Sequence, residues 1–406
     1  MATRQEVFYF EEIVDGKDGP LDGDEVENIF TLSECKMLND DIQLPAKRGG
    51  ATLTAVTSAQ GKTLLYLIGG ANRAAEAFGD VHVLDWETMR WNQAKPLLES
   101  APFIPRSGHT AVAWGSRIFV FGGANLRIDT VFNDLHVLDT VQMKWLRPIV
   151  GGDVPPPRNS HVAVATAHGM VVIGGSSPQV GAMNDVYLLP WPASDGDALR
   201  WRRIYPTSTL MSKRELHSAC VDGDRILVVG GRSSSGQLCS DLCVLNTDSW
   251  TWTITPLPAW QRCAHASGVV GRTRWLHFGG WEGGQDFLSD CWELSLDSSV
   301  QSSPACASTS TSRERRRGYR DTSICQMRPV PLQLVVGQPK DPSTCPNQHV
   351  IDVAFMDPEE TATGLAGRFA HCACVVDEST FVVFGGMTPE ADLNDVWVLE
   401  CNGSRT

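Results

Sequence analysis

Short apolar stretches recur along the whole chain, and six of them end in a pair of glycines. The stretches are mostly five to eight residues long and rich in Val, Ile, Leu and Phe, which is typical of buried β-strands and too short for helices. The first five pairs begin 53, 52, 56 and 49 residues apart, which predicts a repeat of about fifty residues. The paired glycines are Gly69 and Gly70, Gly122 and Gly123, Gly174 and Gly175, Gly230 and Gly231, Gly279 and Gly280, and Gly385 and Gly386.

Two further features keep a nearly constant distance from each glycine pair. An Arg-x-x-His motif precedes five of the six pairs, whereas the first unit has Arg48 and Ala51 at these positions. After each pair, an Asp begins a second apolar stretch whose alternation indicates a half-buried strand, so each unit predicts four short strands. A Trp follows this Asp by eleven residues in three units, at Trp91, Trp145 and Trp252. The motif residues are Arg106 and His109, Arg158 and His161, Arg214 and His217, Arg262 and His265, and Arg368 and His371.

The combination of Arg-x-x-His, glycine pair, Asp-led strand and spaced Trp resembles the kelch repeat family over residues 45 to 401. The resemblance implies an all-β fold, a kelch-type β-propeller in which six blades of four antiparallel strands surround a central channel. The sixth glycine pair begins 106 residues after the fifth, so a seventh, degenerate blade is the alternative count. No further glycine pair occurs between Asp297 and Arg368, which favours six blades.

Charge and composition divide the chain further. Residues 1 to 28 are predicted to form an acidic N-terminal arm, since the segment from Glu11 to Asn28 carries eight acidic residues and one Lys. Residues 29 to 406 are predicted to form a single propeller with a low-complexity insertion at about 298 to 360. The insertion begins with a polar run that cannot bury enough apolar surface to pack, and PLQLVVG and HVIDVAF beyond it are candidate strands.

The last unit ends after its third strand, which leaves one edge of that blade without a partner. Residues 29 to 32 precede the first unit, where a fourth strand is expected. We therefore predict that this N-terminal strand closes the ring by pairing with residues 394 to 400, because pairing removes an exposed edge. Residues 6 to 13 are the competing donor.

The repeated histidines and tryptophans are interpreted as scaffolding. Propeller symmetry distributes equivalent positions around a ring, so the five histidines of the motif cannot converge on one metal ion. Each imidazole is instead expected to join a hydrogen-bonded turn inside its own blade. The Trp residues are expected to fill the gaps between blades, and the glycine pairs to allow sharp turns and close backbone approach. The residues two positions after each Asp, such as His82, Tyr187 and Trp292, share no obvious chemistry and indicate packing.

A partner-binding face is predicted from the geometry of a four-stranded blade. The first strand starts and the second strand ends on the same face, so the motif arginines should surround the mouth of the channel. There they either pair with a local Asp or receive carboxylates and phosphates of a partner. The loops that follow the glycine pairs share this face and vary between units, as recognition loops do. The candidate contacts are Arg106, Arg158, Arg214, Arg262 and Arg368 from the motif, and Arg73, Arg127, Arg232, Trp281 and Met387 from the loops.

Composition narrows the classes of function. The net charge of −13 disfavours nucleic acid and anionic membranes as partners, and no apolar stretch approaches the roughly 20 residues of a membrane span. The twelve Cys lack zinc-like spacing and several lie in apolar strands, which indicates reduced thiols. Because the N-terminus does not look like a leader, we expect a cytoplasmic protein, with the nucleus as the alternative location. We also expect a monomer without metal or cofactor.

The kelch resemblance leaves several functions to compare. Kelch-type copper oxidases need a Tyr and His ligand set that the five Tyr of this chain do not reproduce. Specifier-like kelch enzymes use a Glu, Asp and His triad, but here Leu84 follows Glu76 and Asp80 where the His is required. The favoured function is a non-catalytic scaffold or adaptor that binds another protein, similar to Rab-effector kelch proteins. That similarity implies vesicle traffic or signalling and a small GTPase or signalling protein as partner. A small-molecule-binding, isomerase or specifier-like enzyme is the second function, and a ubiquitin-ligase substrate adaptor is the third.

Overall fold

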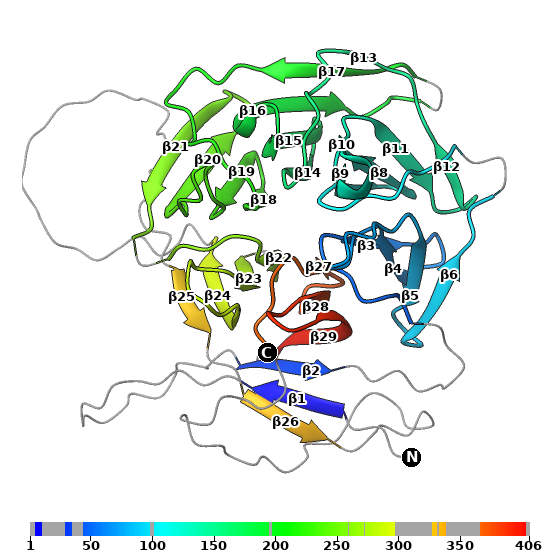
Figure 1. The fold of residues 1–406 in the computed structure, drawn as a ribbon, viewed down its shortest axis with the longest axis vertical. Coiled ribbons are helices and arrows are strands. Elements are labelled where there is room, and N and C mark those ends of the chain that lie inside the picture. Colours follow the sequence, from blue (N-terminus) through cyan, green and yellow to red (C-terminus); the bar gives the residue numbers. More distant parts are fainter. Residues whose placement is uncertain are drawn as a thin grey trace, which may run out of the picture.

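The structure is a computed structural model of the chain, and it describes residues 5–9, 29–34, 44–97, 101–194, 197–258, 260–271, 273–296, 327–330, 333–337 and 366–402. The strands form six sheets of four or more strands arranged around a common axis (Figure 1). In each sheet the first strand of the unit lies nearest the axis, and consecutive strands pair antiparallel. The predicted all-β propeller of six blades is confirmed, and the described residues contain no seventh blade.

The first three blades follow one another without interruption. Blade 1 comprises β3 (Thr52–Thr57), β4 (Thr63–Ile68), β5 (Val81–Asp85) and β6 (Arg90–Ala94). Blade 2 comprises β7 (Thr110–Trp114), β8 (Arg117–Phe121), β11 (Leu135–Asp139) and β12 (Lys144–Leu146), and its loop carries β9 (Ala124–Asn125), the 3-10 turn η1 (Leu126–Ile128) and β10 (Thr130–Val131). Blade 3 comprises β14 (Val162–Thr166), β15 (Gly169–Ser177), β16 (Gly181–Pro190) and β17 (Leu199–Ile204), with β13 (Val150–Gly152) added parallel to β17.

The remaining blades complete the ring. Blade 4 comprises β18 (Ser218–Asp222), β19 (Arg225–Val229), β20 (Asp241–Asn246) and β21 (Thr251–Pro256). Blade 5 comprises β22 (Ala266–Val270), β23 (Arg274–Gly280), β24 (Leu288–Ser295) and β25 (Met327–Val330). Blade 6 comprises β27 (Cys372–Val375), β28 (Thr380–Met387), β29 (Asp392–Asn402) and β2 (Ile29–Glu34), and it continues outward to β26 (Gln333–Gly337) and β1 (Gln5–Tyr9).

The N-terminal strand closes the ring as predicted. Strand β2 pairs antiparallel with β29, with Ser33 opposite Val398 and Ile29 opposite Asn402. The competing donor, β1, pairs with β2 and β26 instead (Figure 1). Of the two candidate strands in the long excursion, QLVVG forms β26, whereas HVIDVAF and most of the acidic arm lie outside the described residues.

Six apolar clusters fill the spaces between neighbouring blades, and together they make the core. Each cluster joins side chains of two adjacent sheets, such as Tyr66 of blade 1 and Val120 of blade 2. A Trp from the outermost repeat strand reaches into the cluster shared with the preceding blade, as expected from the spacing. These residues are Trp91, Trp145, Trp201 and Trp252, and none is more than 5% exposed.

Candidate functional site

The arginine of each repeat ties together two parts of its own blade. Arg106 donates from Nη1 to Asp134 Oδ1 at 2.6 Å and from Nη2 to Asp134 Oδ2 at 3.2 Å. The same Nη1 donates to the carbonyl of Gly122, the first glycine of the pair, at 3.0 Å. The six equivalent arginines are at most 2% exposed. The other five pairs are Arg48 with Asp80, Arg158 with Asp185, Arg214 with Asp241, Arg262 with Asp290, and Arg368 with Asp395.

The predicted ring of partner-binding arginines is therefore wrong in this structure. The guanidinium groups are buried and already neutralised by an Asp, and the competing prediction of local pairing holds. A buried charge that loses its partner is costly, so these arginines are not available to an incoming ligand. The prediction of partner binding is therefore wrong for the five motif arginines, Arg106, Arg158, Arg214, Arg262 and Arg368.

A second donor to the same Asp was missed in the sequence. The side chain two positions later points its ring N–H at the carboxylate: His136 Nε2 lies 3.0 Å from Asp134, and Trp397 Nε1 lies 2.6 Å from Asp395. Burial by itself raises the pKa of Asp134, but hydrogen bonds from His136 and Arg106 hold that pKa far below its ordinary value. The variety of side chains at this position predicts packing alone, and the structure adds a hydrogen bond to the Asp. The shared feature, a ring N–H in four of the six units, was visible at His82, His136, Trp292 and Trp397.

The histidines of the motif join neighbouring blades, which corrects the expectation that each would serve its own blade. His109 Nε2 in blade 2 lies 3.1 Å from the hydroxyl of Thr52 in blade 1. His371 in blade 6 donates from Nε2 to the carbonyl of Phe278 in blade 5 at 3.0 Å. The same contact between blades is made by His161 to Thr110 and by His265 to Ser218.

The glycine pair makes room for these contacts. A Cβ at Gly69 would lie 2.7 Å from Cε1 of His109 in the next blade, and a Cβ at Gly123 would lie 2.8 Å from the Cβ of His109 in its own blade. Both glycines have positive φ, +64° and +92°. The second glycine of each pair also donates its N–H to the carbonyl of the motif arginine in the next blade, as Gly123 does to Arg158 at 2.8 Å. The residues of the repeat motif therefore connect each blade to its neighbour.

The innermost turn of each blade forms a closed ring around the axis. The residue before the motif His donates its backbone N–H to the carbonyl of the equivalent residue in the preceding blade, at 2.8 to 3.1 Å, and the sixth bond, from Gly50 to Ala370, completes the circle. All six residues are left-handed, with φ between +53° and +65°. This conformation costs a residue with a Cβ about 1 kcal/mol. The ring consists of Gly50, Gly108, Ser160, Leu216, Ala264 and Ala370.

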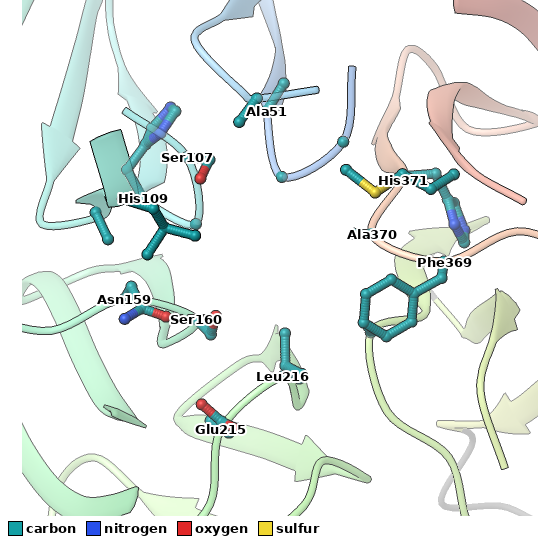
Figure 2. A pocket seen from close by; sticks show the side chains of 18 of the residues that line it. Ala51, Ser107, His109, Asn159, Ser160, Glu215, Leu216, Phe369, Ala370 and His371 are labelled. Atoms are coloured by element: carbon teal, nitrogen blue, oxygen red, sulfur yellow. Dashed lines mark hydrogen bonds between the residues drawn. The ribbon is translucent and has the colours of Figure 1, made fainter. Parts of the chain in front are cut away.

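A pocket of about 520 Å³ lies over this ring on the loop face of the propeller. Residues from all six blades line it, and Figure 2 shows them surrounding a common centre. Ser107, Asn159, Ser160 and Glu215 occupy one side, whereas Phe369 and Ala370 lie opposite (Figure 2). Polar side chains of blades 2 to 4 therefore face the apolar side chains of Phe369 and Met387 of blade 6, and blade 1 adds the polar side chains of Asn72 and Arg73 to the lining.

Glu215 and Arg232 form the charged part of the polar side. Arg232 donates from Nε to Glu215 Oε1 at 2.9 Å, and Ser176 donates its hydroxyl to the other carboxylate oxygen. The Arg232 side chain is 36% exposed. Its two Nη atoms form no hydrogen bond with the residues that the structure describes, so they are available to an acceptor that enters the pocket.

The five loop residues predicted as contacts fall in different places. Arg73, Arg232 and Met387 line the pocket. Arg73 is anchored, because its Nη1 donates to the carbonyl of Pro389 at 2.7 Å and it pairs with Asp392. Arg127 is exposed on η1, outside the pocket lining. Trp281 also lies outside the lining and donates from Nε1 to the carbonyl of Gly284.

The imidazoles that border the pocket are unsuited to proton transfer at neutral pH. Burial, and after it the positive charge of the neighbouring motif arginine, lowers the pKa of His109, His217 and His371 to about 3. A general base works best with a pKa near the operating pH, so these rings are weak bases for catalysis. Within the described ranges, no group of three His, Cys, Asp or Glu side chains could hold a metal ion. The same ranges contain no helix of the length and apolarity that crossing a membrane requires.

Comparison with known proteins agrees with this architecture. Residues 28–194 and 170–360 match the KLHDC2/KLHL20/DRC7 Kelch-repeats domain. Kelch domain-containing protein 3 of Homo sapiens is 28% identical over 211 residues, which are 47% of this chain and 54% of that protein. The Rab9 effector protein with kelch motifs of Gallus gallus is 36% identical over 127 residues, 31% of this chain and 33% of that protein.

A third relative is longer still. Acyl-CoA-binding domain-containing protein 4 of Arabidopsis thaliana is 37% identical over 145 residues, which are 36% of this chain and 20% of that protein. The matched part of this chain thus spans from a fifth to about half of the length of these relatives. Six blades joined by a repeated Arg and glycine pair, with the motif His in five of them, and the match over residues 28–360 show that the chain belongs to the Kelch-repeat family.

Proposed function

We propose that the chain is a non-catalytic protein-interaction module, a scaffold or adaptor that binds a partner protein on the loop face of the propeller. The observation that carries this proposal is the pocket at the centre of that face. Its two sides differ, with hydrogen-bonding groups from Ser107 to Arg232 facing the apolar side chains of Phe369 and Met387. A segment with one apolar side chain and an accepting oxygen could use both sides at once.

Exposed residues at the edge of the pocket favour a protein as the ligand. Leu126 lines the pocket and is 76% exposed, and Ile128 on the same turn is 55% exposed. Arg127 lies between them and is also exposed. Apolar side chains and an Arg standing together on a rigid turn are typical anchors of protein interfaces. The binding surface would therefore extend from the pocket over η1.

The name of one relative suggests a class of partner. The Gallus gallus protein is called a Rab9 effector, and it is 36% identical to this chain over 127 residues. We therefore include small GTPases among the partners to be tested, with roles in vesicle traffic or signalling as the corresponding cellular context. The pocket volume also fits a small molecule, so small-molecule binding is the second candidate function.

The proposal is tested by cross-linked affinity capture with a pair of matched variants. Leu126→Asp places a charge on the loop face, and Val141→Asp places the same charge at the turn between β11 and β12, at the opposite end of blade 2. The two side chains are almost equally exposed, at 76% and 77%, so neither change should disturb folding. We expect Leu126→Asp and Arg232→Ala to lose partners that the wild type and Val141→Asp retain.

Two outcomes would contradict the proposal. If Val141→Asp loses the same partners as Leu126→Asp, the loop face is not the binding surface. If no protein depends on the loop face, while a metabolite raises the melting temperature of the wild type but not of Arg232→Ala, the second candidate replaces the first.

A further inference from the structure

Blade 3 differs from the other blades at its outer rim. Strand β17 carries three arginines, and strand β13 is added parallel to it, with Gly151 opposite Arg200. Arg200, Arg202 and Arg203 are all exposed. In the part of the chain that the structure describes, none of the three forms an ion pair. The outer rim of blade 3 therefore carries a strip of three guanidinium groups without an ion-pair partner among the described residues, and the nearby carboxylate of Asp153 accepts only the backbone N–H of Arg203.

The geometry of the strip suits an extended ligand. Arg200 and Arg202 alternate with the buried Trp201, so they point to the same side and lie about 7 Å apart along the strand. The guanidinium of Arg200 lies close to Gly151, where a Cβ would be 3.9 Å from its Cζ, so no side chain of β13 covers it. Arg203 points to the other side of the strand, where its Cζ lies 5.2 Å from the ring centroid of Tyr205 and 5.9 Å from that of Tyr187.

Apolar side chains flank the arginines at both ends. Ile149, immediately before β13, is 92% exposed, and Tyr205, immediately after β17, is 71% exposed. A ligand that covers the arginines would therefore meet one apolar side chain at each end of the strip. The spacing of alternate arginines equals the spacing of alternate side chains in an extended peptide.

Charge identifies the kind of partner. The chain has a net charge of −13, yet residues 101 to 215, which contain blades 2 and 3, carry eleven Lys and Arg against eight Asp and Glu. Arginine pairs with carboxylates in a bidentate manner, and its weakly hydrated head tolerates apolar neighbours. The acidic remainder of the molecule repels long polyanions, which disfavours nucleic acid. We propose that the outer rim of blade 3, formed by Arg200, Arg202 and Arg203, binds an extended acidic segment of a partner protein.

The experiment uses the full chain and a fluorescein-labelled ten-residue peptide of alternating Glu and Val as the probe. Fluorescence anisotropy at low salt should detect binding that weakens as salt is added, since exposed charge pairs are screened. Replacing all three arginines with Gln should weaken binding about tenfold or more. The matched control is Arg90→Gln, because Arg90 precedes Trp91 on β6 as Arg200 precedes Trp201 on β17 and is also exposed.

Three results would overturn the proposal. The first is that the triple Gln variant binds the Glu-Val peptide as tightly as the wild type does, and the second is that a Gln-Val peptide binds the wild type equally well. The third is that phosphatidylserine vesicles or duplex DNA of the same charge compete more effectively than the acidic peptide, a result that assigns the strip to a lipid or nucleic-acid surface. Unchanged melting temperatures of the variants verify folding, and the triple Lys variant, which keeps the charge, should bind more tightly than the triple Gln variant.

Discussion

Gly69 of blade 1 lies so close to His109 of blade 2 that a Cβ at position 69 would stand 2.7 Å from the imidazole Cε1. Gly69→Ala should therefore push the ring out of its place between the blades. Overpacking and the left-handed backbone together predict a loss of about 3 kcal/mol in the free energy of unfolding, measured by urea denaturation. The control is Gly115→Ala, which has a similar φ of +58° but open space around the Cβ, and which should lose only about 1 kcal/mol. Equal losses in the two variants would show that the contact with His109 is unimportant.

The Arg106 and Asp134 pair should be essential for stability. Arg106→Leu leaves Asp134 without its main partner, and the side chain of Asp134 is only 16% exposed. We expect a loss of about 3 kcal/mol in the free energy of unfolding. Lys62→Gln, which breaks the more exposed pair with Asp85, should change the urea midpoint very little. A stable Arg106→Leu variant with altered partner binding would instead restore the idea of a partner-facing arginine.

Acid should unfold the propeller at a relatively mild pH. Burial lowers the pKa of His109, His217 and His371 from 6.5 to about 3, and it also lowers the pKa of His161, His265 and His277. The unfolded chain takes up protons below pH 6.5 that the folded chain does not, so stability is complete above pH 6.5 and falls as the pH decreases. Below pH 6.5, each imidazole lowers the free energy of unfolding by about 1.4 kcal/mol for every pH unit.

Thermal melting between pH 8 and pH 5 measures this effect. Because six imidazoles act together, most of a typical domain stability of about 5–15 kcal/mol should be lost within one to two units below pH 6.5. Asp80 and Asp134, whose pKa values are held below the ordinary range, act in the same direction only below about pH 4. A melting temperature that stays constant from pH 7 to pH 5 contradicts the burial of neutral imidazoles.

The inner ring should tolerate and even prefer glycine. Ala370 has a φ of +55°, and the equivalent residues of blades 1 and 2 are already Gly50 and Gly108. Ala370→Gly should raise the free energy of unfolding by about 0.5–1 kcal/mol, since it relieves the left-handed strain. Ala219→Gly on β18, where the backbone is an ordinary strand, should lower it by a similar amount. If both variants are destabilised, the strain at position 370 is compensated by packing.

Much of the fold could be predicted from the sequence because repetition makes weak local signals mutually supporting. The structure contains the strands and turns that the sequence predicts at the glycine pairs, the spaced Trp residues and residues 29 to 32. The ring N–H groups of His136 and Trp397, in contrast, were overlooked because two chemically different side chains perform one task. The shared function, donation of a ring N–H to the Asp, can be recognised only when the position of the Asp carboxylate is known.

The repeat, the strand order within a blade and the N-terminal strand that closes the ring depend on local alternation and spacing, so they could be predicted from the sequence. The contacts of the motif residues, in contrast, are visible only in the folded molecule. Arg106 turned inward to Asp134, 28 residues away, and His109 reached across to Thr52 in the preceding blade. Such contacts depend on how the blades are arranged around the axis. No local pattern could therefore distinguish a buried contact within or between blades from an exposed binding site.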